Sequence, residues 1–337
     1  MINQNSPEYE KETVILAQID LTTGSIPKTL LRFAFPMICG NLLQQLYNVA
    51  DTLIVGRFLG SDALGAVGSS YTLMTFLTSI LLGLCMGSGA LFSVCWGQRD
   101  LARLRRQTHA AFVLIAVCTV VLNAAAFLLL DAMKTLLSVP AEVWPLMRSY
   151  LFVIFFGIGG TFLYNYYASL LRAVGNSLVP LLFLAAAAVL NIALDLVFVL
   201  VCRWGVEGAA AATVLAQWLS GIGTAVYTLV RCPELRARRE ERRITGSMLR
   251  ELLSASVLTC LQQSVMNLGI LMVQGRINSF GPVIMAAFAA AVKIDSFAYM
   301  PLQDFGNAFS TFIAQNYGAQ QPERIRRGIR TAVILSS

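Results

Sequence analysis

The chain has 337 residues, of which 57% are hydrophobic and 13% are charged, and its mean hydropathy is +0.68. These values exclude ordinary water-soluble folds and indicate a protein whose surroundings are mostly lipid. The formal net charge is +7, from 25 basic and 18 acidic residues. The seven cysteines lie mostly in apolar runs and no two form a Cys-x-x-Cys pair, so we interpret them as small hydrophobic residues.

Hydropathy and turn signals predict eight transmembrane helices. A helix needs about 20 apolar residues to cross a hydrocarbon core of roughly 30 Å, and no run shows the alternation of a membrane barrel. The predicted spans are 31–56, 63–96, 110–130, 149–171, 179–201, 206–230, 250–275 and 283–314. A ninth helix is expected to open around Ile329, and the chain reaches Ser337 before it could cross a bilayer, so we expect the sequence to be truncated.

The distribution of basic residues predicts the orientation. An N-terminus in the cytoplasm places 19 of the 25 lysines and arginines on that side, with the densest cluster at residues 231–250. We interpret this cluster as a loop that faces anionic headgroups, and we expect no nucleic-acid partner. The expected location is the plasma (inner) membrane of a bacterium or archaeon, with many passes.

An internal repeat is visible at a spacing of about 220 residues. Residues 31–45 are echoed by residues 249–263, both beginning with Leu-Arg and ending with Leu-Gln-Gln. Further matched positions are Gly60 with Gly281, Gly97 with Gly318, and Arg103 with Arg324. Because six helices separate the copies, both copies have the same orientation in the membrane.

These observations predict an all-α polytopic membrane fold of two pseudo-symmetric six-helix bundles, the second one incomplete. The predicted parts are a cytoplasmic N-terminal segment (1–30), an N-lobe of six helices (31–230), a basic cytoplasmic linker (231–249) and a partial C-lobe (250–337). The last part would contain two helices and the start of a third.

Charged residues inside apolar helices are the most informative feature, because each is costly in lipid and persists when it is paired, hydrated or used. Asp51 lies in the first predicted helix. Asp195 lies in the fifth, four residues after Asn191, so these two side chains share one helical face. Two carboxylates and an amide converging in a low dielectric would bind a small hard cation or protons. The alternative is that they join helices by hydrogen bonds.

The eighth predicted helix carries Lys293, Asp295 and Asp304. Lys293 and Asp295 are two residues apart and so cannot be assumed to pair with each other; structural pairing and a cavity-lining role both stay open. Candidate cavity-lining residues are Gln44, Tyr47, Lys293, Asp295 and Asp304. Pro36, within the first helix, is a candidate bend.

Several stretches resemble the prokaryotic multidrug and toxic compound extrusion (MATE) family. The N-terminal signature is matched by residues 21–28, Pro36, and residues 44–51, 55–60 and 63–68. Residues 274–281 and 312–319 are similar to the seventh and eighth helices of the family. The resemblance implies two bundles that form a V around a central cavity.

The resemblance also implies a coupling site. Asp51, Asn191, Asp195 and Thr213 match the first-lobe cation and proton site of the DinF-like branch, so any bound sodium is expected at these four residues. In the family, ion binding there is thought to rearrange the first helix, where Pro36 would bend. The seventh helix carries only Glu251 at its end, so no second-lobe sodium site is expected.

The predicted function is a secondary active antiporter that exports cationic or amphipathic compounds in exchange for protons or sodium. The expected partners are those substrates, the ions and membrane lipids, and the expected state is a monomer. We expect no cofactor besides an ion gradient, and no metal besides sodium. A flippase of lipid-linked saccharides is the alternative, although it would call for arginines inside the helices. No nucleotide-binding loop, nucleophile elbow or zinc motif is present, so we expect no enzyme.

Overall fold

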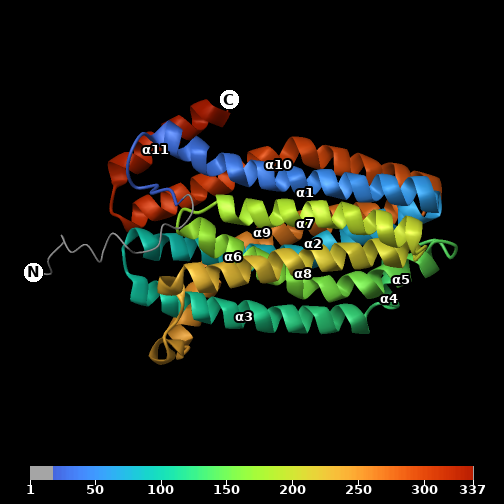
Figure 1. The fold of residues 1–337 in the computed structure, drawn as a ribbon, viewed down its shortest axis with the longest axis horizontal. Helices are drawn as coiled ribbons and strands as arrows, with labels where there is room; N and C mark the ends of the chain where they lie inside the picture. The colour runs from blue at the N-terminus through green and yellow to red at the C-terminus, as the bar shows by residue number, and fades with distance from the viewer. Residues whose placement is uncertain (1–17, 337) are drawn as a thin grey trace, which may run out of the picture.

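The structure is a computed structural model that describes residues 18–336, apart from the side chains of residues 293, 296, 298 and 336. Within that part, the regular structure is helical throughout, and the long helices run side by side along one axis (Figure 1). The all-α prediction is confirmed. The long helices are α1 (Ile26–Leu59), α2 (Ser61–Gly97), α3 (Leu101–Leu128), α7 (Leu178–Asp195), α8 (Gly205–Arg231), α9 (Gly246–Asn278) and α10 (Pro282–Gly318).

Shorter helical segments complete the bundle. They are α4 (Ala132–Leu136), α5 (Trp144–Ile154), η1 (Phe155–Gly157), α6 (Ile158–Ala173), η2 (Leu196–Val201), η3 (Pro233–Leu235), η4 (Arg239–Arg242) and α11 (Pro322–Ser336). The fourth predicted span consists of α5, η1 and α6, and the fifth consists of α7 and the π-helix η2. All eight predicted spans therefore fall on helical segments.

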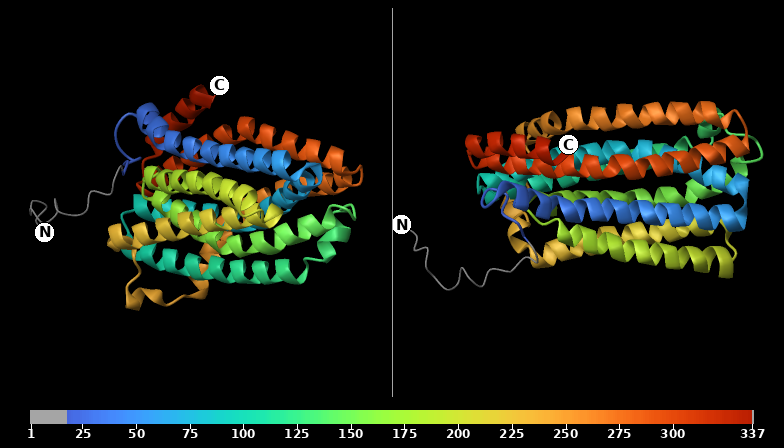
Figure 2. Two further views of the ribbon diagram at one scale, coloured as in Figure 1. Left: turned by 45° about the vertical axis from the view of Figure 1, so that its right-hand side comes forward. Right: turned by 90° about the horizontal axis from the view of Figure 1, so that it is seen from above.

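Six of these segments are long and apolar enough to cross a membrane. They do not include α1 and α10, although these have 34 and 37 residues and lie within the bundle (Figure 2). The interior of α1 carries polar side chains, such as Asn41 and Gln45, which lower its hydropathy, whereas in α10 the continuous described apolar part is the shorter stretch Pro282–Val292. The ninth helix begins at Pro322 rather than near Ile329, because its first half is charged and hydropathy missed it.

One end of the bundle, which we call the basic end, gathers residues 18–25, the 232–245 linker and the start of α11 (Figure 1). The linker is anchored there by Arg105 of α3, whose Nε and Nη2 atoms donate to the two carboxylate oxygens of Glu241 at 2.8 Å each. These hydrogen bonds lower the pKa of the Glu241 carboxyl below its usual value.

The internal repeat is visible in the backbone. Gly60 and Gly281 precede α2 and α10 with φ of 93° and 97°, and Arg99 and Gln320 follow these helices with φ of 57° and 56°. A positive φ is uncommon outside glycine, so its recurrence 221 positions later (99 and 320) indicates the same turn built twice.

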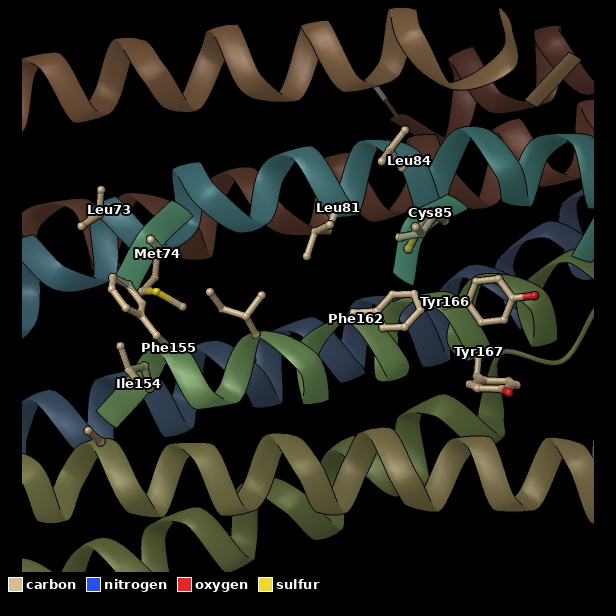
Figure 3. Close-up of a cluster of buried hydrophobic side chains, with 14 of the residues drawn as sticks. Leu73, Met74, Leu81, Leu84, Cys85, Ile154, Phe155, Phe162, Tyr166 and Tyr167 are labelled. Carbon is tan, nitrogen blue, oxygen red and sulfur yellow. The ribbon is translucent and has the colours of Figure 1, made fainter. Parts of the chain in front are cut away.

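The core is filled by aromatic and aliphatic side chains between α2, α3, α5 and α6. Figure 3 shows Leu81 and Cys85 of α2 near Phe162, Tyr166 and Tyr167 of α6. The Tyr166 hydroxyl donates to the carbonyl of Thr108 at 2.6 Å, so this buried ring has its polar atom satisfied.

Glycines let α2 approach α9 and α10 closely. A Cβ atom at Gly87 would lie 2.4 Å from the Cα of Ser256, and one at Gly83 would lie 2.4 Å from the Cα of Cys260. One at Gly68 would lie 2.1 Å from the Cβ of Ala289. Contacts this close join helices by van der Waals packing, which drives association in lipid.

Gly87→Ala is expected to lower the melting temperature by several degrees, because the new methyl group would collide with the α9 backbone. Gly269→Ala in α9 is the matched control, since nothing lies within 4 Å of a Cβ there. Alanine gains roughly 0.5–1 kcal/mol over glycine inside a helix, so the control should be neutral or stabilising. Thermal unfolding in detergent checks this, and equal melting temperatures would contradict the close packing.

Candidate functional site

Two buried carboxyl groups from different helices lie within electrostatic reach of one another. Asp51 of α1 is 6% exposed and Asp195, at the end of α7, is fully buried. The two side chains lie close enough for the charge of Asp51 to act on Asp195. Like charges at short range in an apolar interior repel strongly, so this pair favours a bound proton or cation.

An amide and a hydroxyl extend the carboxyl pair. Asn191 lies one turn before Asp195 on the same face of α7 and is fully buried. Its Nδ2 atom donates to the Oγ1 atom of Thr213 in α8 at 3.3 Å. The structure thus places the four predicted residues on three adjacent helices, α1, α7 and α8.

The backbone changes at the site. α7 ends at Asp195, and the π-helix η2 follows directly. The wider turn of a π-helix shifts the side chains that follow it relative to an α-helix, and such segments occur frequently at functional sites. Asp195 therefore lies where the helix changes its hydrogen-bonding pattern.

Several buried oxygen atoms at the site are hydrogen-bond acceptors for which the structure shows no donor. Among the described residues, neither carboxylate oxygen of Asp195 nor the Oδ1 atom of Asn191 has a hydrogen-bond partner. A buried acceptor without a donor is costly, and a buried charge more so. Oxygen ligands suit a hard cation such as sodium, and a proton would also remove the charge.

The groups that the site could offer an ion are few in number. Within residues 18–336 no group of three or more His, Cys, Asp or Glu side chains could hold a metal. Two carboxylates with an amide and a hydroxyl provide less negative charge than the carboxylate-rich sites of divalent cations.

Tyr150 is a site residue that the sequence did not reveal. It lies in α5, is 5% exposed, and its hydroxyl lies within electrostatic reach of Asp51, Asp195 and Tyr47. A tyrosine among Leu, Phe and Met has no pattern that separates it from packing residues. Only the three-dimensional arrangement identifies it.

The predicted cavity-lining residues separate into different places. Gln44 and Tyr47 are half-buried on α1 and hydrogen bond to each other, with Tyr47 near Asp51. Asp295 is exposed on α10, and the side chain of Lys293 lies outside the described residues. Pro36 lies inside α1, which continues through it.

Asp304 forms a second polar contact, away from the carboxyl pair. It is 3% exposed and accepts a hydrogen bond from Nδ2 of Asn41 in α1 at 2.5 Å. The guanidinium of Arg172, at the end of α6, lies within electrostatic reach. Because Asn41 precedes Asp51 by ten residues on α1, the two contacts are about 15 Å apart along that helix.

Comparison with known proteins gives the family. The MatE family model matches residues 36–197 and 255–337. The probable multidrug resistance protein YpnP of Bacillus subtilis is 31% identical over 312 residues, which cover 91% of this chain and 68% of that protein. The chain belongs to the MatE family. It is therefore a multi-pass membrane protein of the MATE multidrug efflux transporters, which are not enzymes.

Solved structures of other MATE-type transporters share the fold. One is a MOP superfamily transporter from Pyrococcus furiosus, with a TM-score of 0.85 at 23% identity, covering 94% of this chain and 71% of that one. Another is an outward-facing multidrug resistance MATE family transporter, with a TM-score of 0.80 at 23% identity and the same coverages. At this identity the likeness shows the fold alone.

Asp195→Asn is expected to leave the melting temperature of this MatE protein unchanged or raised. The carboxylate accepts no hydrogen bond from the described residues, and a neutral amide removes the repulsion between position 195 and Asp51. Asp304→Asn is the matched comparison and should lower the melting temperature, because Asp304 is paired with Asn41 and lies near Arg172. Destabilisation by Asp195→Asn as large as that by Asp304→Asn would indicate that Asp195 serves to join helices.

Proposed function

We propose that this protein is a secondary active antiporter that exports small cationic or amphipathic compounds in exchange for protons or sodium. The observation that carries the proposal is the buried pair of Asp51 and Asp195 between α1 and α7. Without a bound ion the two carboxylates repel each other. A sodium ion between them would attract both, and a proton would neutralise one of them. The packing of α1 against α7 then depends on the ion.

The position of α1 supports a coupling role for this pair. Toward the basic end, Phe33 and Met37 of α1 pack in one apolar cluster with Ala308 and Phe312 of α10. The same helix therefore carries one carboxyl of the ion site and part of the contact with the second half of the chain. An ion shifts an equilibrium between two arrangements only when it binds one of them better, and repulsion between Asp51 and Asp195 supplies that difference.

The proposed substrate class follows from relatives and from charge. YpnP is described as a multidrug resistance protein. Of the buried charged groups in the described helices, Asp51, Asp195 and Asp304 are acids, which attract cations. The flippase alternative has less support, because the one arginine at the edge of this interior, Arg172, lies beside Asp304 and hydrogen bonds to Tyr164.

The proposed orientation places the basic end in the cytoplasm of a bacterium or archaeon, with the chain acting as a monomer. Many arginines lie at this end, in the 232–245 linker and in the first turns of α11, and both segments are seen there in Figure 1. Cytoplasmic loops of membrane proteins are enriched in such residues. The two halves, 31–230 and 250 onward, would act as two lobes around the substrate path.

Efflux of ethidium from energised membrane vesicles tests the ion site. Asp51→Asn and Asp195→Asn are each expected to reduce efflux to near background while protein amount and melting temperature stay unchanged. Asp62→Asn is the matched control, since Asp62 is exposed in the first turn of α2. Normal gradient-driven efflux by both site variants would contradict the assignment.

The coupling ion can be identified in proteoliposomes by imposing a proton gradient or a sodium gradient separately. One of the two is expected to drive ethidium export, and Asp195→Asn should abolish export under that gradient. Export that persists after both gradients are collapsed would contradict antiport.

A further inference from the structure

Arg324, in the first turn of α11, holds the segment that leads into α1. Its guanidinium donates to the carbonyl oxygens of Leu21 (3.2 and 3.3 Å), Thr23 (2.6 Å) and Gly24 (2.7 Å). It also lies over the ring of Phe312, 5.5 Å from the centroid. One side chain of the second half thus binds the carbonyl oxygens of three residues within a four-residue stretch of the N-terminal segment.

The segment itself, residues 18–25, crosses the basic end between the two halves; we call it the strap. The Ile19 amide donates to the Gly175 carbonyl at 2.9 Å, on the α6–α7 turn. Asn316 of α10 donates to the Leu21 carbonyl at 3.1 Å. The Leu21 side chain is fully buried in the apolar cluster that contains Ala308. The strap therefore contacts both halves and covers the cluster between them.

Arg103, in the first turn of α3, makes the corresponding contact from the first half. Its Nη2 atom forms an ion pair with Glu251 of α9, and its Nη1 atom donates to Gln98 at 3.1 Å. Gln107 donates to the other oxygen of Glu251 at 2.6 Å. Glu251 lies near the start of α9, as Leu21 to Gly24 lie just before α1.

The two arginines are equivalent in the internal repeat, since positions 103 and 324 are 221 residues apart. The ends of α2 and α10, which lie just before these arginines in the chain, also contact each other in an equivalent way. A Cβ atom at Gly97 would lie 2.1 Å from the Gln315 carbonyl oxygen, and one at Gly318 would lie 2.2 Å from the Val94 carbonyl oxygen. These positions differ by 221 as well (97 and 318, 94 and 315). The same cross-contact is therefore built twice at this end.

We infer that Arg103 and Arg324 form a matched pair of latches that close the basic end, each reaching from one half to the entry of the first helix of the other. Their placement at the cytoplasmic side, and the need to open them for substrate entry, rest on the proposed function. Opening requires that both latches release and that the strap lifts Leu21 out of its cluster. The Leu21–Lys28 motif is thus the strap and the start of α1.

The latches are suited to reversible release. The side chains of Arg103 and Glu251 are 35% and 37% exposed. Exposed ion pairs are weak because water competes for both partners. The hydrogen bonds from Arg324 to the Thr23 and Gly24 carbonyls are likewise exposed, so water can replace the guanidinium there, whereas those to the Leu21 carbonyl are partly buried. Such contacts bias the closed arrangement without making it permanent.

Maleimide labelling of a cysteine beneath the strap tests this inference. Ala308→Cys is the reporter, because Ala308 is fully buried in the cluster that Leu21 covers. The full chain is labelled in detergent, where both ends are accessible, and labelling of the native cysteines is subtracted with the same variant lacking the reporter. Adding Arg324→Ala is expected to raise the labelling rate about tenfold by shifting the population toward the open end. Arg324→Lys should be intermediate.

Arg326→Ala is the matched control, since Arg326 pairs with Glu323 on its own helix. It should leave the rate unchanged. Arg103→Glu should raise the rate, and Arg103→Glu with Glu251→Arg should return it toward the parent, which a purely structural role for either residue would not produce. Equal rates for Arg324→Ala and Arg326→Ala, or no rescue by the exchange of charges, would overturn the latch. Neither drug nor gradient is needed, so failure of ethidium efflux leaves this result intact.

Discussion

The rest of the structure depends on the placement of two like charges, Asp51 and Asp195, in an apolar bundle. A single carboxylate in lipid can be satisfied by neighbouring donors, but two that face each other cannot both be ionised without an ion between them. Asp195 accepts no hydrogen bond from the described residues, whereas Asn191 is tied to Thr213. The amide and hydroxyl therefore hold each other in place, and under the proposed function the carboxyl pair would respond to protons or sodium.

The proposed coupling requires a link between the carboxyl pair and the second half of the chain, and α1 provides it because it packs against both α7 and α10. Its Asn41 contacts Asp304 of α10, and its Asp51 contacts the Asp195 site of α7. Pro36 lies between the strap and Asn41, at a point where one helical hydrogen bond is missing. Under the proposed function, the missing bond would let the basic half of α1 bend relative to the half that carries Asp51.

Much of this arrangement could be predicted from the sequence because membrane helices leave strong signals. Apolar runs located the eight spans, and the four-residue spacing of Asn191 and Asp195 placed both on one face. Tyr150 could not be found in this way, since a tyrosine in an apolar helix looks like packing. The partner of Asp304 was also hidden, because Asn41 is an uncharged residue far away in the chain. The start of α11 was missed for the opposite reason: its first half is too charged for hydropathy to detect.

As far as the described residues extend, the two halves repeat their backbone but differ in where their buried acidic residues lie. The turns at Gly60 and Gly281 are alike, yet α9 carries no acid beyond Glu251, and the position equivalent to Asp304 is Gly83. Under the proposed function, ion binding at the carboxyl pair of the first half would act on the packing of α1 against α7, and α10 would be the surface against which α1 moves. The paired arginines at the basic end, by contrast, keep their symmetry because closing an end requires both halves equally.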